Sequence, residues 1–159
     1  MVAGYLGSLG PNMDSARTYP KVEIAQRQLD TAIRLFLEGK DFFSVVTLAG
    51  AADEILGKEL EHRGLVSALR NTSEIGARVS AAFDKPPSTA QEIRDRANYA
   101  RNHLKHHGDP NAAAVTLDIR QEAIDMLSRA FDNATMLDGP WSPEMYEYNE
   151  WFLEHEIGA

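Results

Sequence analysis

The residues best suited to chemistry in this chain lie together in the segment Arg101-Asn102-His103-Leu104-Lys105-His106-His107, just before Gly108-Asp109-Pro110. An arginine guanidinium is permanently cationic and can hold a phosphate group through paired hydrogen bonds. An imidazole can give and accept a proton near neutral pH. An arginine and a histidine that meet at a phosphodiester can therefore cleave it by acid–base chemistry without a metal ion. We expect neither a metal nor another cofactor in this chain.

The spacing within this segment limits which side chains can meet. Asn102 and His106 are four residues apart and share one face of a helix, whereas Arg101 and Lys105 share the neighbouring face. Arg101 and His106 are five apart and diverge by about 140° on an ideal helix. They can converge if the last helical turn loosens, if the arginine reaches around, or if a two-fold dimer brings two copies of this helix end together. The alternative is a solvated cationic helix end, which the helix dipole favours.

Helical periodicity surrounds the segment and predicts the elements that hold it. Apolar residues recur at helical spacing over residues 20–38, 41–62, 89–107 and 113–137. Thr89 and Glu92 fit a capping box at the start of the third stretch. A very short turn joins the first two stretches, which makes them an antiparallel hairpin. Gly50, in the middle of the second stretch, predicts a close crossing by a neighbouring helix. No strand pattern is convincing, so the sequence predicts an all-α, up-and-down bundle of four main helices.

Three other segments complete the predicted organisation. Residues 65–83 form a helical insert with a weaker pattern, which Asn71-Thr72-Ser73 can divide into two short helices. Residues 1–17 are rich in glycine, serine, proline and asparagine, and we expect a flexible arm. Residues 139–159 form an acidic tail with a short aromatic helix that begins near Ser142-Pro143. The predicted bundle therefore spans residues 18–138.

Composition sets limits on the class of protein. A chain of 159 residues has the usual length of a single domain, so we expect one domain. It contains no cysteine, which excludes a disulfide framework, a thiolate metal site and a thiol nucleophile, and which fits a reducing cytoplasm. No apolar run approaches the roughly 20 residues of a membrane helix, and residues 1–12 lack the basic start of a secretory signal. We expect a cytoplasmic protein without a membrane partner.

The charge is acidic overall but uneven. A formal net charge of −8 argues against a protein that coats nucleic acid by bulk attraction. Residues 140–159 contain glutamates and no lysine or arginine, whereas residues 90–107 carry more arginine and lysine than carboxylate, with three histidines besides. The sequence is therefore compatible with a small basic site on an acidic body.

The pattern Arg101-Asn102-x-x-x-His106, with this order of helices around it, resembles the R-x4–6-H signature of the HEPN superfamily, in which a polar residue often follows the arginine. The sequence from Lys21–Asp30 through Ala51–Leu56 also looks like the corresponding sequence of small bacterial proteins of this kind. The resemblance covers residues 18–138. It implies a HEPN-like bundle that acts as a homodimer and cleaves RNA without a metal.

The resemblance also implies roles for single residues. Arg101 would hold the scissile phosphate and stabilise its developing charge. His106 would act as general acid or base for attack by the RNA 2′-hydroxyl, which leaves a 2′,3′-cyclic phosphate. Asn102 would orient the histidine or the phosphate. His107 also satisfies the signature, and we favour His106 because the asparagine directly follows the arginine.

Further contacts and partners follow from the same resemblance. Lys105, His107 and His103 would be additional contacts to the RNA phosphates. Many members of the superfamily are toxins paired with a nucleotidyltransferase-like antitoxin, so an antitoxin protein is a possible partner. Other members are inactive and serve as binding or dimerisation modules, which is the alternative function here.

Two other hypotheses come from the residues themselves. Glu59-Leu-Glu-His62 has the Glu-x-x-His spacing of di-iron bundles, but such sites need a second copy of the motif, and the chain has none. The aromatic tail from Trp141 to Phe152 fits a non-catalytic interaction protein, or packing on the chain's own bundle or dimer. Asp53 and Glu54 could pair with arginines of the motif helix across the bundle.

Overall fold

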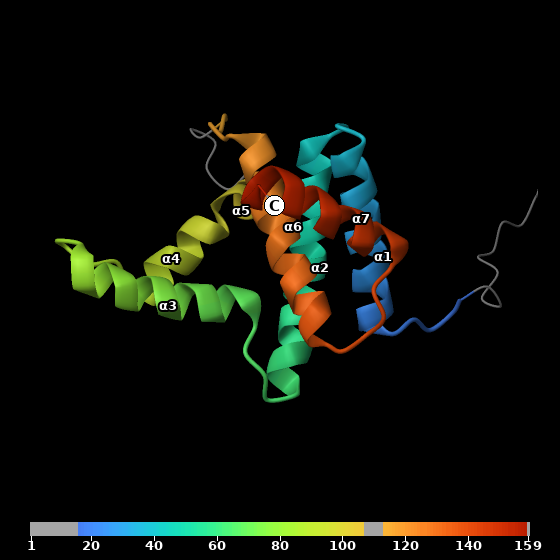
Figure 1. The fold of residues 1–159 in the computed structure, drawn as a ribbon, viewed down its shortest axis with the longest axis horizontal. Helices are drawn as coiled ribbons and strands as arrows, with labels where there is room; N and C mark the ends of the chain where they lie inside the picture. Colours follow the sequence, from blue (N-terminus) through green and yellow to red (C-terminus); the bar gives the residue numbers. More distant parts are fainter. Residues whose placement is uncertain (1–15, 107–112, 159) are drawn as a thin grey trace, which may run out of the picture.

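A computed structural model describes residues 16–106 and 113–158, and these residues form helices and connecting turns without a β-strand (Figure 1). The elements are α1 (Lys21–Leu37), α2 (Phe42–His62), α3 (Ala68–Phe83), α4 (Ala90–Ala97), α5 (Tyr99–Lys105), α6 (Ile119–Met136), α7 (Pro143–Phe152) and a π-helical turn (Leu153–Ile157). The prediction of an all-α protein is confirmed. The predicted N-terminal arm falls mostly on residues 1–15, which lie outside the described residues.

Three long helices, α1, α2 and α6, form the body of the molecule, with α2 packed against both of the others. The predicted hairpin of α1 and α2 is confirmed, and its signals are local. Gly39 and Gly64 follow the two helices with positive φ angles of 63° and 76°, a backbone region that favours glycine. Asp41 caps α2 by accepting a hydrogen bond from the backbone N–H of Phe43 at 3.1 Å.

The predicted motif helix is not continuous. It starts as expected, because Thr89 Oγ1 accepts from the Glu92 N–H at 3.2 Å and the Glu92 carboxylate accepts from the Thr89 N–H at 2.7 Å. The helix then breaks at Asn98 into α4 and α5. The finer prediction of four main helices is therefore not confirmed, since the fourth is two short pieces beside a three-helix body.

The long-range contact of Arg129 in α6 accounts for this break. Arg129 Nη1 donates to the carbonyl of Ala97 at 2.8 Å, and its Nη2 donates to the side-chain oxygen of Asn98 at 3.1 Å. A side chain from another helix thus hydrogen-bonds the backbone where the helix is interrupted, which offsets the cost of ending it there. The motif residues lie on α5, after the break.

Two further helix boundaries differ from the prediction. The insert is one continuous helix, α3, because the Ser73 hydroxyl donates to the Arg70 carbonyl at 2.9 Å and is satisfied inside the helix. The helix predicted from residue 113 starts only at Ile119, where Asp118 accepts from the Gln121 N–H at 3.1 Å. A good N-cap residue inside the predicted stretch sets the true start.

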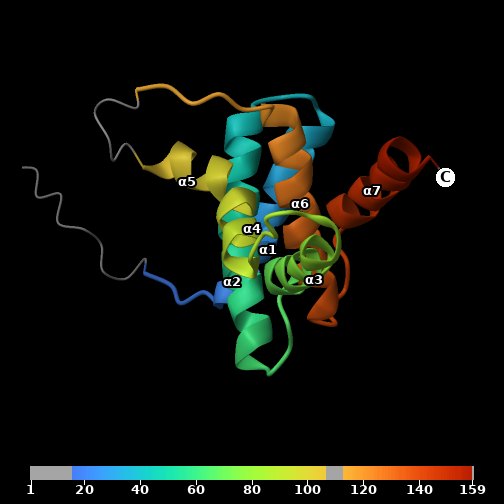
Figure 2. The same ribbon diagram turned by 90° about the vertical axis from the view of Figure 1, so that its left-hand side faces the viewer.

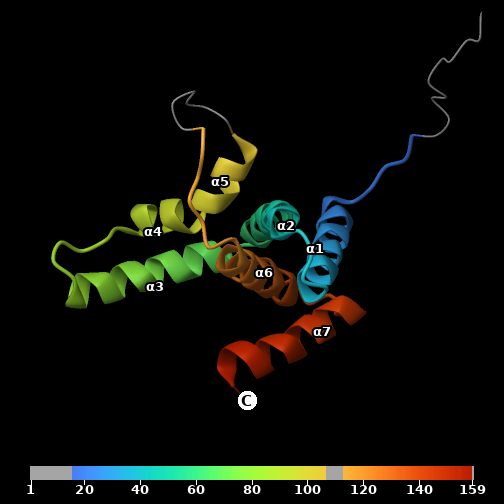
Figure 3. The same ribbon diagram turned by 90° about the horizontal axis from the view of Figure 1, so that it is seen from above.

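The α3–α4 pair projects to one side of the body (Figures 1 and 3). On α3 the usual polarity is reversed, since Ser73 and Ser80 are buried while Ile75, Val79 and Phe83 are exposed. Phe83 is 83% exposed. The periodicity in this segment therefore identified a helix but not the side that faces the protein.

The C-terminal tail packs on the chain's own core. Ser142 caps α7, and Tyr148 is only 2% exposed among the rings of Phe36, Phe131 and Trp151. Burial raises the pKa of the Tyr148 hydroxyl, which lies 3.0 Å from Ser128 Oγ. Helix α7 lies on the opposite side of the body from α5 (Figures 2 and 3). Of the placements that the sequence left open for this tail, the structure shows packing on the chain's own bundle.

Among the described helices, none combines the length and the apolar character that crossing a membrane requires.

Candidate functional site

Arg101 is positioned by a glycine in the neighbouring helix. It projects from α5 onto α2, where its aliphatic carbons lie against Gly50. A Cβ built at Gly50 would lie 2.7 Å from Arg101 Cδ and 2.9 Å from its Cγ, closer than side chains tolerate. The close crossing predicted at Gly50 is therefore an approach of the Arg101 side chain. The result is an arginine that is only 16% exposed, with its charged end directed along α2.

The guanidinium of Arg101 has few partners in the described part of the chain. Its Nη1 lies 3.5 Å from Glu54 Oε2, at the outer limit of a hydrogen bond, and its buried Nε has no hydrogen-bond partner there. Glu54 itself is 57% exposed. Exposed pairs of this kind contribute about 0–1 kcal/mol. The expected pairing of Glu54 with the motif helix is thus present but weak.

Arg129 differs from Arg101 at its terminal nitrogens, whereas its buried Nε likewise has no partner among the described residues. Its Nη2 donates to Asp53 Oδ2, in addition to its bonds at the helix break. Asp53 is 4% exposed, and Asn133 donates to its other carboxylate oxygen at 2.9 Å. Asn133 in turn accepts from the Ala68 N–H at 2.8 Å, where α3 begins. The pairing predicted for Asp53 therefore goes to an arginine of α6 and not to the motif helix.

This buried network joins α2, α6, the start of α3 and the break before α5. Burial raises the pKa of the Asp53 carboxyl, while the positive charges of Arg129 and, to a smaller extent, Arg101 oppose that rise. The network fixes the backbone from which α5 starts, so it also fixes where Arg101 points. We regard Asp53, Arg129 and Asn133 as positioning residues.

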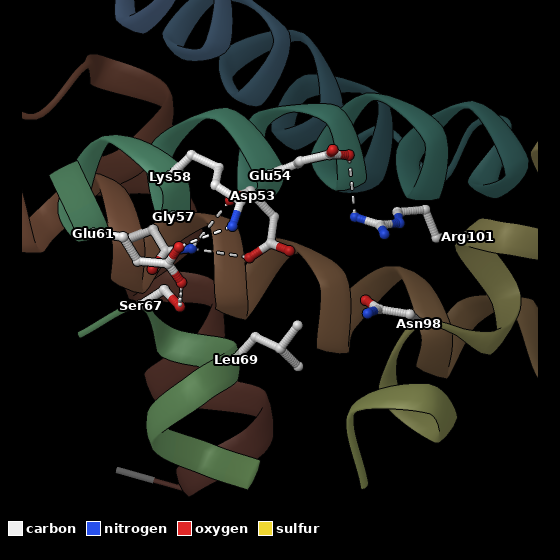
Figure 4. Close-up of a pocket in the computed structure, with 10 residues that line it drawn as sticks. Asp53, Glu54, Gly57, Lys58, Glu61, Ser67, Leu69, Asn98 and Arg101 are labelled. Atoms are coloured by element: carbon white, nitrogen blue, oxygen red, sulfur yellow. Dashed lines mark hydrogen bonds and ion pairs between the residues drawn. The ribbon is translucent and has the colours of Figure 1, made fainter. Parts of the chain in front are cut away.

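A polar pocket of about 190 Å³ lies over this network (Figure 4). Arg101 and Asn98 border one end, and Glu61 and Ser67 lie toward the other. The other cation of its wall, Lys58, is paired with Glu61 at 2.9 Å, and this hydrogen bond holds the pKa of Glu61 below its usual range. Arg101 is therefore the cation of this wall with the most unused hydrogen-bonding capacity.

The remaining predicted site residues lie on the exposed part of α5. Asn102, His103, Lys105 and His106 are all exposed, and His106 ends the helix with extended backbone angles. His106, His103 and Lys105 line a second pocket of about 210 Å³ together with residues 113–115. Arg101 and His106 thus line different pockets of one chain, as their spacing predicts. His107 lies outside the described residues.

The described residues contain no group of three or more histidine, cysteine, aspartate or glutamate side chains placed to hold a metal ion. Within the Glu-x-x-His stretch, Glu59 accepts a hydrogen bond from Arg63 Nε at 2.8 Å.

The sequence reasoning missed the buried network, although a signal for it existed. Asp53 lies between Ala49 and Leu56 in the apolar stripe of α2, and Asn133 continues the stripe of Met126 and Ala130 in α6. A polar residue at an inward position of two facing helices indicates a buried hydrogen bond.

The Gly50 contact makes a testable prediction about stability. Gly50→Ala should stabilise an Arg101→Ala background by about 1 kcal/mol, because alanine is the better helix former. In the otherwise unchanged chain the gain should be smaller or reversed, since the new methyl group meets the Arg101 stem. Urea unfolding of the four chains measures the difference. An equal gain in both backgrounds would show that the arginine does not lie against Gly50.

In comparisons with known proteins, no family model, no curated protein and no solved structure matches this chain.

Proposed function

We propose that this chain is a metal-independent endoribonuclease of the HEPN type that works as a homodimer. The observation that carries the proposal is the contrast between two arginines on the same side of the body. Both terminal nitrogens of Arg129 are engaged, by Asp53, Asn98 and the Ala97 carbonyl, although its Nε, like that of Arg101, has no partner among the described residues. Arg101 is held by packing against Gly50 and makes one long contact to an exposed carboxylate. An arginine placed in this way can exchange that contact for a phosphate, to which it binds in paired geometry.

The chemistry assigned to the site needs an acid–base group and a charge stabiliser. His106 takes the proton of the RNA 2′-hydroxyl while water protonates the departing 5′-oxygen, or it protonates that oxygen while water takes the 2′-hydroxyl proton. The 2′-oxygen forms a bond to phosphorus as the bond to the 5′-oxygen breaks. The products are a 2′,3′-cyclic phosphate and a 5′-hydroxyl. Arg101 stabilises the extra negative charge on the phosphoryl oxygens.

The geometry of α5 is the reason for proposing that two copies divide the roles. Within one subunit, Arg101 and His106 line separate pockets on different sides of a short helix. A two-fold pairing of α5 ends would set the arginine of one copy against the histidine of the other. Asn102 and Lys105, both exposed, would then contact the same strand of RNA. The acidic remainder of the chain would confine RNA to this small area.

The alternative is a HEPN-like binding or regulatory module without activity. It is favoured by the carboxylate of Glu54 beside Arg101, which competes with a phosphate for the guanidinium. This alternative predicts RNA that stays intact in every assay below.

The test of the proposed function is cleavage of end-labelled RNA in an excess of EDTA. The unchanged chain should cut the RNA and leave cyclic phosphate ends, and RNA with a 2′-deoxyribose at the cleaved position should stay intact. Arg101→Ala and His106→Ala should each lose this activity. Arg27→Ala and His155→Ala are matched controls, because the first removes an exposed pair on α1 and the second lies beyond α7. Intact RNA with the unchanged chain, or equal cleavage by all variants, refutes the proposal.

A further inference from the structure

The exposed side of α5 carries an aromatic pair that the core does not use. The rings of Tyr99 and His103 are four residues apart, with centroids 4.0 Å apart and planes inclined by 34°. Tyr99 is 44% exposed, His103 is exposed, and neither packs against the hydrophobic core. Their outer surfaces are therefore open to solvent.

The pair is fixed in place. His103 Nδ1 lies 2.8 Å from the carbonyl oxygen of Tyr99, which must accept the hydrogen bond, so Nδ1 carries the proton. Tyr99 directly follows Asn98, the residue that Arg129 holds from α6. Rings fixed in this way lose little freedom when a flat ligand stacks on them.

The surroundings of the pair suit a nucleic acid strand. Residues 99–106 contain two cations and two histidines and no carboxylate, in a chain whose net charge is −8. Asn102 lies on the same exposed side of α5 as the rings, and His106, which is also exposed, follows the last residue of the helix. A polyanion with flat groups beside its phosphates matches this arrangement of charge and aromatic surface.

We propose that Tyr99 and His103 form a stacking platform for an unpaired nucleobase of single-stranded RNA, beside the phosphate site of Arg101 and His106. This inference rests on the proposed function and names its substrate class. Bases within a duplex are stacked on each other and cannot reach a protein ring, whereas bases of a single strand can be splayed out and stacked. The platform therefore selects single strands without selecting a particular base.

The test is the affinity for a short fluorescent single-stranded RNA, measured by anisotropy in EDTA. All chains carry His106→Ala, so that the RNA stays intact. Tyr99→Ala should bind at least about fivefold more weakly, the lower end of what one stacked base contributes, and Tyr99→Phe should bind as tightly as tyrosine. Tyr146→Ala is the matched control, since it removes an exposed tyrosine from α7. Circular dichroism and thermal unfolding confirm that each variant folds.

A second arm links the effect to the base itself. The chain that keeps Tyr99 should bind RNA with abasic sites as weakly as Tyr99→Ala binds normal RNA. Tyr99→Ala should bind the two RNAs with equal affinity. Equal affinity of Tyr99 and Tyr99→Ala, an equal loss on duplex RNA, or no binding of single strands overturns the platform.

The two proposals fail in different ways. If RNA is cleaved with dependence on Arg101 and His106 but Tyr99→Ala keeps its affinity, the platform is wrong and the ribonuclease stands. If Tyr99 governs affinity but no cleavage occurs, the platform stands and the ribonuclease is wrong.

Discussion

Replacing Asp53 by alanine is expected to lower the free energy of unfolding by about 3–5 kcal/mol. The change leaves the guanidinium of Arg129 without its anionic partner, and the Arg129 side chain is only 12% exposed. It also removes the carboxylate acceptor of the Asn133 side-chain amide, which is 0% exposed and keeps only its 3.3 Å bond to the backbone carbonyl of residue 53. Removing one member of a buried ion pair costs far more than the pair contributes as a whole, because the remaining charge stays out of water.

Two further variants separate the buried charge from simple loss of packing. Asp53→Ala combined with Arg129→Met should recover much of the loss, since it removes the stranded charge and keeps a long side chain in place. Glu59→Ala breaks the exposed pair with Arg63 and should change stability by no more than about 1 kcal/mol. Urea unfolding measures all three. If the double variant is as unstable as Asp53→Ala, packing rather than charge explains the effect.

The same network predicts an effect on the site. Arg129 hydrogen-bonds the helix break from which α5 starts, and Tyr99 and Arg101 follow that break within one helical turn. A variant that removes the hydrogen bonds of Arg129 to the break is therefore expected to change the direction of α5. The positions of the candidate site residues thus depend on the carboxylate of Asp53 in α2, which acts through Arg129 of α6.

Substitution of the two motif residues is expected to have the largest effect on activity. Arg101→Ala should lower kcat by about 10²–10³-fold, the range found when one charge-stabilising donor is removed. His106→Ala should lower it by about 10²–10⁴-fold, the usual contribution of a positioned acid or base. His106 is exposed, and Arg101, although largely buried, lies outside the core cluster, so both variants should fold. Single-turnover cleavage in EDTA measures the losses, and Lys40→Ala, which breaks an exposed pair, is a control for charge.

Much of the fold follows from local signals in the sequence. The caps at Asp41 and Ser142, the capping box at Thr89 and the glycines that follow α1 and α2 each act within a few residues. A sequence pattern is sufficient to find such features. The start of α6 was misplaced because the cap at Asp118 lies inside a stretch that also has helical spacing.

The break at Asn98 and the reversed polarity of α3 have another cause. Both depend on contacts with distant residues, Arg129 in the first case and Arg94 with Ile93 of α4 in the second. Tertiary packing overrides the local helical pattern at these places. No local signal distinguishes the inner from the outer side of α3.

The candidate site was predictable in composition but not in arrangement. The sequence singled out both Arg101 and Gly50, whereas their contact requires the approach of α5 to α2. It also raised Asp53 as a partner for arginine, but the arginine comes from α6, 76 residues further along the chain. The sequence identifies the charged groups, and only the fold determines how they pair.

The proposed mechanism has Arg101 of one subunit and His106 of the other acting on the same phosphate. Its most direct test is a heterodimer, isolated through two different affinity tags, of one Arg101→Ala subunit and one His106→Ala subunit. Each variant alone is expected to be inactive, while the heterodimer keeps one arginine facing one histidine and should cleave RNA in EDTA within a few-fold of the unchanged dimer. A heterodimer as inactive as its parents, beside an active unchanged chain, would contradict the shared site, and an unchanged chain that leaves RNA intact would contradict the ribonuclease itself.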